Sequence, residues 1–556
     1  MQFGFIIDNR RCIGCHACTV ACKAEHDTPL GVNRTWVKYI EKGEFPNTRR
    51  LFSVMRCNHC ADAPCVEICP TGSLFTREDG IVDFDKRRCI GCKACMQACP
   101  YDALYIDPET DTAAKCNYCA HRVDIGLEPA CVNVCPTHAI ISGDMDDPQS
   151  EISQLLAHEQ VTVRKVEKGT QPKLFYIDGD EASLNPAATD QSSDYMWNSQ
   201  ISGVGHFASY AENRIASSDP QELLNQLTGS NGDDKQWLSS EKNPKEKVLV
   251  PESQDSETIQ QKAKDVVEET TKRVYDSPGK GVLWGWEVPA YIWTKAVSTG
   301  AFLVPFLAFV GGFSSVSDPV QWLGLSLGLL FLVLTNILLI KDLDQPFRFA
   351  YVLLRPQWRS WLVRGGYAIT FYGGLLTAGI ITKLSGLTNL EILVKWLCAI
   401  VAVITSVYTA FLLAQAKGRD FWQSPILPFH MIVHSMLAGA AIFAFLSPIA
   451  GFDQSWHTYL DHVFYTFIIL NLLIISVELF TPHPTADSKV VVDMIIRGRF
   501  KRLFKVGVVI MGNIVPLFFV LLGSPELLPF VGLLILMGIY FTEHIWVLAP
   551  QLVPLS

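Results

Sequence analysis

The feature that most constrains this chain is a block of cysteines between residues 12 and 135. Sixteen of the seventeen cysteines lie there, in four groups of four. Two groups have the spacing C-x2-C-x2-C-x3-C, and the other two lengthen only the middle gap, to four and to eleven residues. In this spacing three thiolates bind one face of a cubane cluster, and the fourth reaches a neighbouring cluster. The sequence therefore predicts four [4Fe–4S] clusters held by Cys12, Cys15, Cys18, Cys22, Cys57, Cys60, Cys65, Cys69, Cys89, Cys92, Cys95, Cys99, Cys116, Cys119, Cys131 and Cys135.

Two other uses of paired cysteines fit this block less well. Disulfides form in oxidising compartments, and the residues before the first cysteine have none of the features of a secretory signal. A zinc site takes four ligands from two C-x2-C pairs, which gives no reason for the third cysteine of each group. His16 and His59 lie between ligands, but cysteine already fills every ligand position. We expect these histidines beside the clusters or at the surface.

Length and composition divide the chain into unlike parts. Its 556 residues are too many for one hydrophobic core, so two or three domains are expected. The net charge of −9 gives no indication of a nucleic-acid partner. The sequence is polar up to about residue 281 and dominated by apolar runs after it. We predict a cluster domain over 1–181, a polar linker over 182–281 and a membrane domain over 282–556.

The first part is predicted to be an α+β fold of two dicluster ferredoxin-like modules, because short β-type runs flank the cysteine loops. A fold so rich in loops buries little apolar surface, so bound clusters must supply much of its stability. The segment Thr170–Asp180 is predicted as a final edge strand. In the linker, Thr258–Tyr275 has spacing for one amphipathic helix, although the composition is that of a solvated tether.

The last part is predicted to be an all-α bundle of eight transmembrane helices. Most of its uncharged runs reach the length of about 20 residues that crosses the hydrocarbon layer. The runs are 296–317, 319–340, 365–382, 396–416, 421–452, 463–477, 506–525 and 527–542.

Loop charge predicts the orientation of this bundle. The loops after the second, fourth and sixth predicted helices hold thirteen Lys and Arg, and the opposite loops hold two. Lys and Arg accumulate on the cytoplasmic side of a membrane. The chain enters the first helix from the same side as the thirteen. We therefore expect a multi-pass protein of the cytoplasmic (inner) membrane, with the cluster domain in the cytoplasm.

Two stretches resemble known families. Residues 1 to about 181 are similar to the four-cluster electron-transfer subunit of the molybdopterin oxidoreductases, the group of DMSO, polysulfide and tetrathionate reductases. Residues 284–550 resemble the NrfD-like membrane subunit of polysulfide reductase, which is linked to quinone. The first resemblance is carried by DNRRCIGCHACTVACKAE, RCNHCADAPCVEICPTGSL, RCIGCKACMQACPYDA and KCNYCAHR…CVNVCPTHAI, and the second by WGWEVPAYIW, KDLDQPFRFAYVLLRPQWRSWLVRG and LLAQAKGRDFWQSPILP.

The resemblance implies an electron-transfer and membrane-anchor subunit. It would relay electrons through four [4Fe–4S] clusters between menaquinone or ubiquinone and a separate catalytic subunit. That partner would carry molybdopterin bis-guanine dinucleotide and act on a sulfur oxyanion such as sulfite, or on a polysulfide-like or DMSO-like substrate. The two families usually form separate subunits, whereas here they are fused. With a cytoplasmic cluster domain, the best match is the cytoplasm-facing sulfite dehydrogenase (quinone) type.

The resemblance also implies crossed ligation, in which the first cysteine group pairs with the fourth and the second with the third. The fourth cysteine of each motif then binds the partner cluster. The expected ligand sets are Cys12, Cys15, Cys18 with Cys135; Cys116, Cys119, Cys131 with Cys22; Cys57, Cys60, Cys65 with Cys99; and Cys89, Cys92, Cys95 with Cys69.

Ionisable residues inside a membrane are costly, which makes them candidates for a quinone site. We predict catalytic roles for His430, His434, Glu287 and Lys295, and quinone binding by Tyr291, Tyr408 and Asp342, with Ser298 and Asp344 nearby. The pocket is expected between the first, fourth and fifth helices, on the cluster-domain side. Purely structural roles remain open: Lys295 is near enough to the interface to snorkel, and the histidines could only tie their helix to its neighbours.

Three alternatives stay open at this stage. Haem is not expected, because His430 and His434 on one helix face cannot both be axial to one iron, and a further ligand such as His544 would be needed. The same relay could serve a hydrogenase or another partner without molybdenum. The bundle could also translocate ions, with Lys295 and Glu287 as proton carriers.

Overall fold

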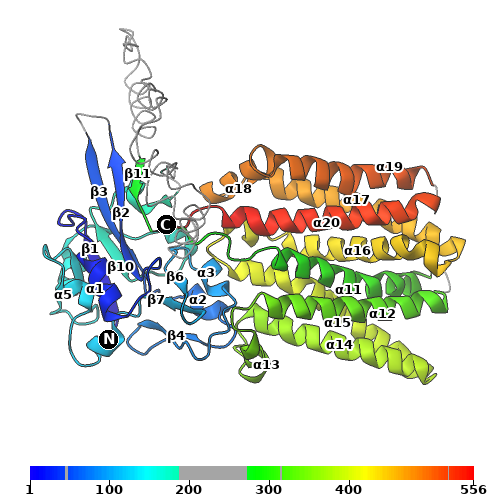
Figure 1. Ribbon diagram of the computed structural model, residues 1–556, viewed down its shortest axis with the longest axis horizontal. Coiled ribbons are helices and arrows are strands. Elements are labelled where there is room, and N and C mark those ends of the chain that lie inside the picture. The colour runs from blue at the N-terminus through cyan, green and yellow to red at the C-terminus, as the bar shows by residue number, and fades with distance from the viewer. Residues whose placement is uncertain (44–47, 187–188, 190–271, 278, 313–315, 524) are drawn as a thin grey trace, which may run out of the picture.

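The computed structural model describes residues 1–43, 48–186, 189, 272–277, 279–312, 316–523 and 525–556. Within these ranges the protein forms a cluster domain and a helical bundle that lie end to end (Figure 1). Most of the predicted linker, residues 190–271, lies outside the described residues.

The cluster domain is built from short elements around the cysteine loops. Its strands are β1 (Phe3–Asp8), β2 (Thr35–Lys42), β3 (Arg49–Arg56), β4 (Leu74–Thr76), β5 (Val82–Phe84), β6 (Leu104–Asp107), β7 (Thr112–Lys115), β8 (Ile140–Asp144), β9 (Val161–Thr162), β10 (Leu174–Ile177) and β11 (Lys272–Tyr275). Its helices are α1 (Ala17–Glu25), α2 (Pro64–Ile68), α3 (Ala94–Ala98), α4 (Ala120–Val123), α5 (Ala130–Asn133), α6 (Glu151–His158), α7 (Glu181–Leu184) and the 3-10 turn η1 (Val166–Lys168). One sheet has the order β8-β1-β10-β9, another β11-β2-β3, and β4–β5 and β6–β7 are hairpins. The predicted α+β class is confirmed.

Two local predictions are wrong. The predicted edge strand is β10, which lies inside its sheet because β9 pairs on its outer side and β1 on the other. Residues 258–271 of the predicted amphipathic helix lie outside the described residues, and only its last four residues, Lys272–Tyr275, are contradicted, because they form β11, which pairs antiparallel with β2. Val274 and Arg273 are buried there, so the last residues of the predicted linker belong to the cluster domain. In both cases pairing with distant strands outweighs the local pattern.

Short helices place the cysteine side chains. In α1, Cys18 and Cys22 are four residues apart and therefore share one helix face. In α3, Cys95 is helical, and the helix ends at Cys99, which adopts an extended conformation before Pro100. Gly91, in the loop before α3, has φ +69, and a Cβ added there would lie 2.6 Å from Cβ of Asp344. Glycine therefore allows both the turn and the close approach of the bundle.

The second half is a bundle of long helices. These are α11 (Glu287–Gly311), α12 (Asp318–Lys341), α14 (Trp361–Leu384), α15 (Thr388–Gln415), α16 (Leu427–Ala450), α17 (Gln454–Phe480), the π-helix η6 (Leu503–Ile514) continued by α19 (Val515–Leu521), and α20 (Leu528–Gln551). Shorter pieces are α13 (Tyr351–Leu354), α18 (Ala486–Ile496) and the 3-10 turns η4 (Pro346–Arg348), η5 (Asp420–Gln423) and η7 (Pro525–Leu527).

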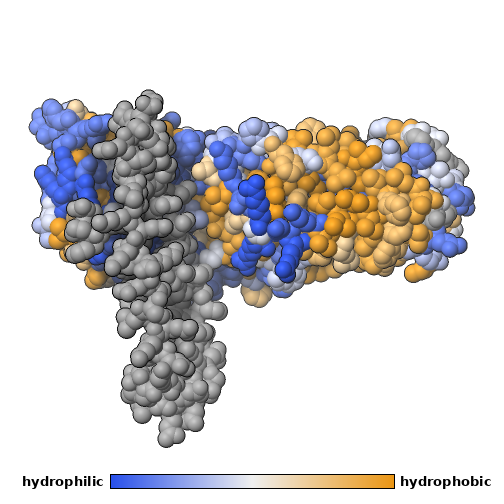
Figure 2. Space-filling view, turned by 90° about the horizontal axis from the view of Figure 1, so that it is seen from above, coloured by the Kyte–Doolittle hydropathy of each residue, from blue (hydrophilic) through white to orange (hydrophobic). Residues whose placement is uncertain are grey.

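Seven helices of the described residues are long and apolar enough to cross a membrane. The predicted count of eight is therefore not met by this criterion. The remaining helix is α14, which packs beside α12 and α15 but carries five glycines and two tyrosines that lower its hydropathy. Figure 2 shows a broad apolar surface along the bundle, bounded by polar ends. The protein is a multi-pass membrane protein.

A buried polar network joins the two halves. Gln97 of α3 donates from Nε2 to Oε1 of Gln551, 2.6 Å away, and the same oxygen accepts the backbone N–H groups of Leu283 and Trp284. The Arg419 guanidinium donates to Oε1 of Gln97 and to the carbonyl of Val553. Cluster domain, the start of α11 and the C-terminal residues are thereby held together.

Candidate metal centres and membrane cleft

The cysteine thiols of the cluster domain gather into four groups. Within each group the thiols interact electrostatically, and every group combines residues from two sequence motifs. The groups are Cys12, Cys15, Cys18, Cys135; Cys22, Cys116, Cys119, Cys131; Cys57, Cys60, Cys65, Cys99; and Cys69, Cys89, Cys92, Cys95. The arrangement follows the crossed pattern expected from the resemblance.

The residues present fit cubane clusters. All sixteen cysteines are free of disulfides, and most are buried. Burial raises the pKa of Cys18 to about 11 and that of Cys119 to about 12, so these thiols hold their protons at neutral pH when nothing is bound. Four sulfur atoms in each group match the four thiolate ligands of a [4Fe–4S] cluster, whose iron would hold them deprotonated.

The four groups follow one another in series through the domain. Neighbouring groups interact electrostatically through Cys18 with Cys131, through Cys116 with Cys57, and through Cys95 with Cys65. At the outer end Cys15 is exposed to solvent. At the inner end Cys92 lines a cleft at the membrane domain. The domain therefore offers a series of four adjacent centres between its surface and the bundle.

Arg56 places a positive charge between two of these groups. Its side chain is fully buried, and Nη1 donates to Sγ of Cys131 at 3.1 Å. The thiols of Cys116 and Cys18 also act on it. Across the described ranges no hydrogen-bond partner is present for its Nε and Nη2 atoms. The guanidinium charge thus lies against sulfur on one side and over the Phe5 ring, whose centre is 4.6 Å from Cζ.

Replacing Arg56 with Leu should lower the reduction potential of the centre that contains Cys131. Reduction adds negative charge, and a buried cation beside the sulfur atoms stabilises the reduced form. Redox titration followed by electron paramagnetic resonance measures this shift. Arg56→Lys should retain most of the wild-type potential, and Arg49→Leu, at an exposed position, should leave it unchanged. Equal potentials in the Leu and Lys variants would contradict the electrostatic role.

The cleft at the inner end lies between the cluster domain and helices α11, α12, α14 and α15. Its walls are mostly apolar, with a few polar groups among them. Its lining consists of Ile90, Cys92, Trp284, Val288, Tyr291, Asn336, Leu339, Asp342, Leu343, Phe349, Val352, Leu353, Leu362, Gly366, Ile369, Thr370, Tyr408 and Leu412. Apolar walls with a small number of directed polar groups are typical of cofactor sites.

The structure brings three predicted residues together in this cleft: Tyr291, Asp342 and Tyr408. Lys295 lies directly behind, with Nζ 4.5 Å from the centre of the Tyr408 ring. Burial raises the pKa of Asp342, just beyond α12, to about 7, although Lys93 acts in the opposite direction. This carboxyl group therefore both gains and loses a proton near neutral pH.

Three other candidates lie elsewhere. Glu287 forms an ion pair with Lys341 at 3.7 Å and is not part of the cleft lining. Asp344 pairs with Lys93 at 2.8 Å and so helps to hold the cluster domain. Ser298 donates to a backbone carbonyl of α12, 2.7 Å away.

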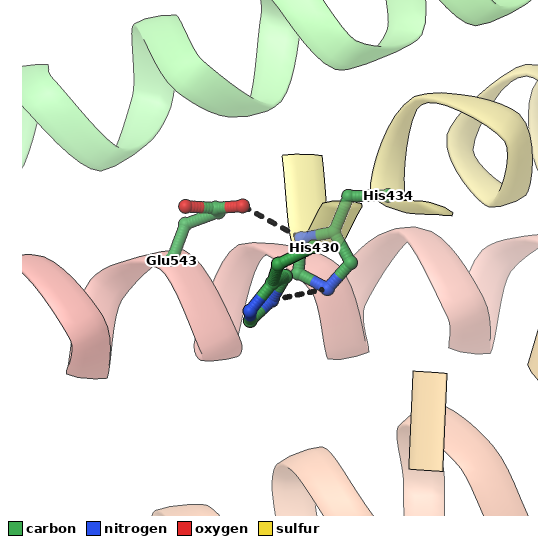
Figure 3. A group of neighbouring side chains, drawn as sticks. All are labelled: His430, His434 and Glu543. Atoms are coloured by element: carbon green, nitrogen blue, oxygen red, sulfur yellow. Dashed lines mark hydrogen bonds and ion pairs between the residues drawn. The ribbon is translucent and has the colours of Figure 1, made fainter. Parts of the chain in front are cut away.

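The two predicted histidines do not line the cleft. His430 and His434 belong to α16 and are buried where this helix faces α17 and α20. Their Nε2 atoms lie 3.0 Å apart (Figure 3). Nδ1 of His430 lies 2.8 Å from Glu478, and Nδ1 of His434 lies 2.6 Å from Glu543.

Both carboxylates were missed in the sequence. Each follows directly on an apolar run, 463–477 or 527–542, and was treated as a flanking charge. An acidic residue still inside the helix, as Glu478 and Glu543 are, was the signal that could have revealed them.

Comparison with known proteins agrees with this division. The family "Polysulphide reductase, NrfD" matches residues 276–553, and two "4Fe-4S dicluster domain" families match residues 11–74 and 48–145. The B subunit of tetrathionate reductase from Salmonella typhimurium is 45% identical over 189 residues, 33% of this chain and 76% of that protein. The B subunit of polysulfide reductase from Wolinella succinogenes is 44% identical over 181 residues, 32% of this chain and 94% of that protein. Protein NrfC of Escherichia coli K12 is 43% identical over 180 residues, which are 32% of this chain and 81% of that protein.

The fold and these sites define an iron–sulfur electron-transfer domain joined to a multi-pass membrane domain. The protein belongs to the NrfD polysulphide reductase family, and its first third is an iron–sulfur subunit of the kind found in the B subunits of polysulfide and tetrathionate reductases.

Proposed function

We propose that this chain transfers electrons between a membrane quinone bound in the cleft and a separate catalytic subunit, through four [4Fe–4S] clusters. One observation carries the proposal: Cys92, from the innermost thiol group, lines the same cleft as Tyr291, Asp342 and Tyr408. Trp284, which also lines the cleft, donates from Nε1 to the backbone carbonyl of Cys92 at 3.2 Å. Each thiol group would hold one cluster, which supplies one-electron carriage when bound.

The cleft has the groups that a quinone requires. The tyrosine hydroxyls of Tyr291 and Tyr408 are available to donate to quinone oxygens, and the Asp342 carboxyl exchanges protons near neutral pH. The apolar side chains around them suit the ring and the start of an isoprenoid tail. Menaquinone and ubiquinone both have this shape, and the type of quinone is left to experiment. No haem role is assigned to His430 and His434, because their ring nitrogens already face each other and two carboxylates.

Asp342→Asn should abolish the pH dependence of quinol oxidation. In the wild type the deprotonated carboxylate accepts a proton from quinol, so the rate should rise with pH through about 7, the pKa that burial gives Asp342, and then level off. The variant should be slower by about a hundredfold, as expected for the loss of a general base, and its profile should be flat. Stopped-flow reduction of the clusters by quinol, followed by visible absorbance, measures both properties.

Asp344→Asn provides the matched control, since Asp344 pairs with Lys93 outside the cleft lining. Because the Asp344 carboxylate also raises the pKa of Asp342, the pH profile of this variant should move to lower pH but keep its shape, and the rate on its plateau should remain that of the wild type. A wild-type profile in Asp342→Asn would remove Asp342 from the quinone site.

The catalytic partner is proposed to dock around the outermost centre. Exposed apolar side chains occur in the two segments, 12–30 and 119–135, that carry cysteines of the two outer groups, and Cys15 in the first segment is itself exposed. They are Ile13, Val20, Leu30, Ile125, Leu127 and Val134. From the resemblance we propose a molybdopterin bis-guanine dinucleotide subunit that acts on sulfite or a related sulfur compound. Copurification with metal analysis tests this, since nickel in place of molybdenum would favour a hydrogenase partner.

The cluster domain is proposed to face the cytoplasm, on the basis of the thirteen-to-two bias in Lys and Arg. The C-terminal residues lie beside the cluster domain, where the carbonyl of Leu555 accepts from Arg164 at 3.2 Å (Figure 1). A fluorescent protein fused after Ser556 should therefore be bright, and alkaline phosphatase at the same position should be inactive. Active phosphatase would reverse the orientation.

A further inference from the structure

A continuous series of buried ionisable side chains crosses from α17 to α20. It runs from Glu478 to His430, to His434 and to Glu543, with successive distances of 2.8, 3.0 and 2.6 Å. Figure 3 draws the last three of these residues. The exposed fraction of each of the four residues is 5% or less. So many buried ionisable groups within membrane-spanning helices are costly, and they persist where they carry protons, ions or substrates.

The hydrogen-bond pattern allows one mobile proton, located between the two histidine Nε2 atoms. Each histidine Nδ1 faces a carboxylate oxygen and donates to it, because a charged carboxylate only accepts. The two Nε2 atoms face each other and share a single proton. With both carboxylates charged, the shared imidazolium leaves one negative charge, which a protonated Lys295 of α11 would offset. A proton added at one end of the series releases another at the opposite end.

The first end of this series reaches a polar cavity. Oε2 of Glu478 accepts from Trp546 at 2.9 Å and faces His430, while Oε1 has no hydrogen-bond partner within the described part of the chain. Glu478 lines a cavity of about 710 Å³ at the junction with the cluster domain. Its other polar walls include Lys168, Asp420 and His483. Because a water needs only about 10–15 Å³ of such volume, the cavity has room for many waters.

The second end reaches the quinone cleft. Glu543 interacts electrostatically with Lys295 and with Tyr291. Nζ of Lys295 donates to Oγ1 of Thr409 at 2.5 Å and lies over the ring of Tyr408. Tyr291 and Tyr408 both line the cleft. The series of charged groups thus ends directly behind the residues proposed to hold quinone.

Close helix packing lies beyond Lys295, deeper in the bundle. A Cβ added to Gly300 of α11 would lie 1.8 Å from the carbonyl oxygen of Ser435, and one added to Gly439 of α16 would lie 2.2 Å from the carbonyl carbon of Gly300. Backbones at this separation leave no space for water between α11 and α16. The polar series is therefore open toward the cluster domain, and the contact between α11 and α16 is closed on its far side.

We propose that the series Glu478–His430–His434–Glu543–Lys295 conducts protons between the quinone cleft and the cavity beside the cluster domain. This inference rests on the proposed quinone site. Oxidation of one quinol yields quinone, two electrons and two protons. The electrons leave one at a time to the cluster domain. Both protons, including the one that Asp342 accepts, reach this series by way of Tyr291, which interacts electrostatically with Asp342 and with Glu543, and they leave on the same side of the membrane. Quinone reduction follows the same route in reverse.

The side of proton release can be measured in liposomes that contain the full chain with its clusters and a short-chain menaquinol. Ferricyanide does not cross membranes, so when added outside it accepts electrons only from molecules whose cluster domain faces outward. Both protons per quinol should then appear in the outer medium, with no acidification reported by a pH-sensitive dye trapped inside. Acidification of the interior would overturn the proposal.

Glu478→Gln tests the path itself. The amide oxygen still accepts from Trp546, so the packing is preserved, but the proton-carrying carboxylate is lost. Quinol oxidation should slow by about a hundredfold, the lower range for loss of a proton-transfer group. Quinone binding, measured by fluorescence quenching, should be unchanged, and small weak acids should partly restore the rate. Glu391→Gln is the control. Glu391 pairs with Lys395 near the start of α15, at the end of the bundle far from the cluster domain, so this variant should oxidise quinol at the wild-type rate.

The outcomes separate the quinone site from the proton path. A wild type that neither binds nor oxidises quinol refutes the proposed function. An active wild type with a normal Glu478→Gln variant refutes only the path. One ligand atom from each of His430, His434 and Glu543 lies within 4.8 Å of the others. A stoichiometric metal ion other than iron, lost in His434→Ala, would therefore replace the proton path with a metal site.

Discussion

Cys95→Ala should reduce quinol-dependent electron transfer to background while the other three centres remain. Cys95 belongs to the innermost thiol group, which includes Cys92 at the cleft. A cubane that loses a thiolate ligand is destabilised, so the iron content should fall from about sixteen to about twelve atoms per chain. Dithionite should still reduce the remaining centres, whereas quinol should reduce none. Iron analysis, visible absorbance and stopped-flow reduction measure these effects.

Two further cysteine variants make this prediction specific. Cys12→Ala removes a ligand of the outermost group, so quinol should still reduce the three inner centres while transfer to the partner is lost. Cys398→Ala changes the seventeenth cysteine, buried in α15 away from the four groups, and should alter neither iron nor turnover. If Cys95→Ala keeps sixteen iron atoms, the ligand assignment is wrong. If it loses a cluster but keeps quinol turnover, quinol is oxidised elsewhere.

The cysteine centres were predictable because their chemistry is local. Ligand spacing within a few residues fixes the type of cluster. The crossing between motifs is not local, and it was expected only from the resemblance. The sheets show the same limit: β10 and β11 take their places from pairing with β1, β9 and β2, which no pattern within either strand specifies.

Three residues that line the cleft, Tyr291, Asp342 and Tyr408, were among those expected at a quinone site, and their role there stays a prediction. Hydropathy located the helices, and the rule that buried charge is costly selected Lys295 and His434. The cleft itself is assembled from four helices, the α13 region and a loop of the cluster domain, so its position follows from tertiary packing alone. The prediction of one pocket between the first, fourth and fifth helices therefore combined residues that lie in two separate places in the structure. Tyr408 belongs to the cleft, and His434 to the polar series that lies behind it.

Gly300→Ala should sharply destabilise the bundle. The added methyl group would meet the backbone of α16, not a flexible side chain, so α11 and α16 must separate. Small residues allow the close helix approach that supports membrane bundles. Overpacking costs about 1–3 kcal/mol where neighbours can adjust, and two opposed backbones have little freedom to do so. The expected result is a much lower yield of folded protein and a lower Tm in detergent.

Gly374→Ala, in α14, is the matched control, since a Cβ there meets nothing within 4 Å among the described residues. It should raise stability slightly, because alanine favours a helix more than glycine does. The two variants also separate packing from function. Tyr291 and Lys295 precede Gly300 on α11, so displacement of this helix moves a cleft residue and the end of the polar series together. Folded Gly300→Ala protein should therefore retain its iron and its reduction by dithionite, but lose quinol turnover. A variant with normal Tm and turnover would show that α11 and α16 are not in backbone contact at this position.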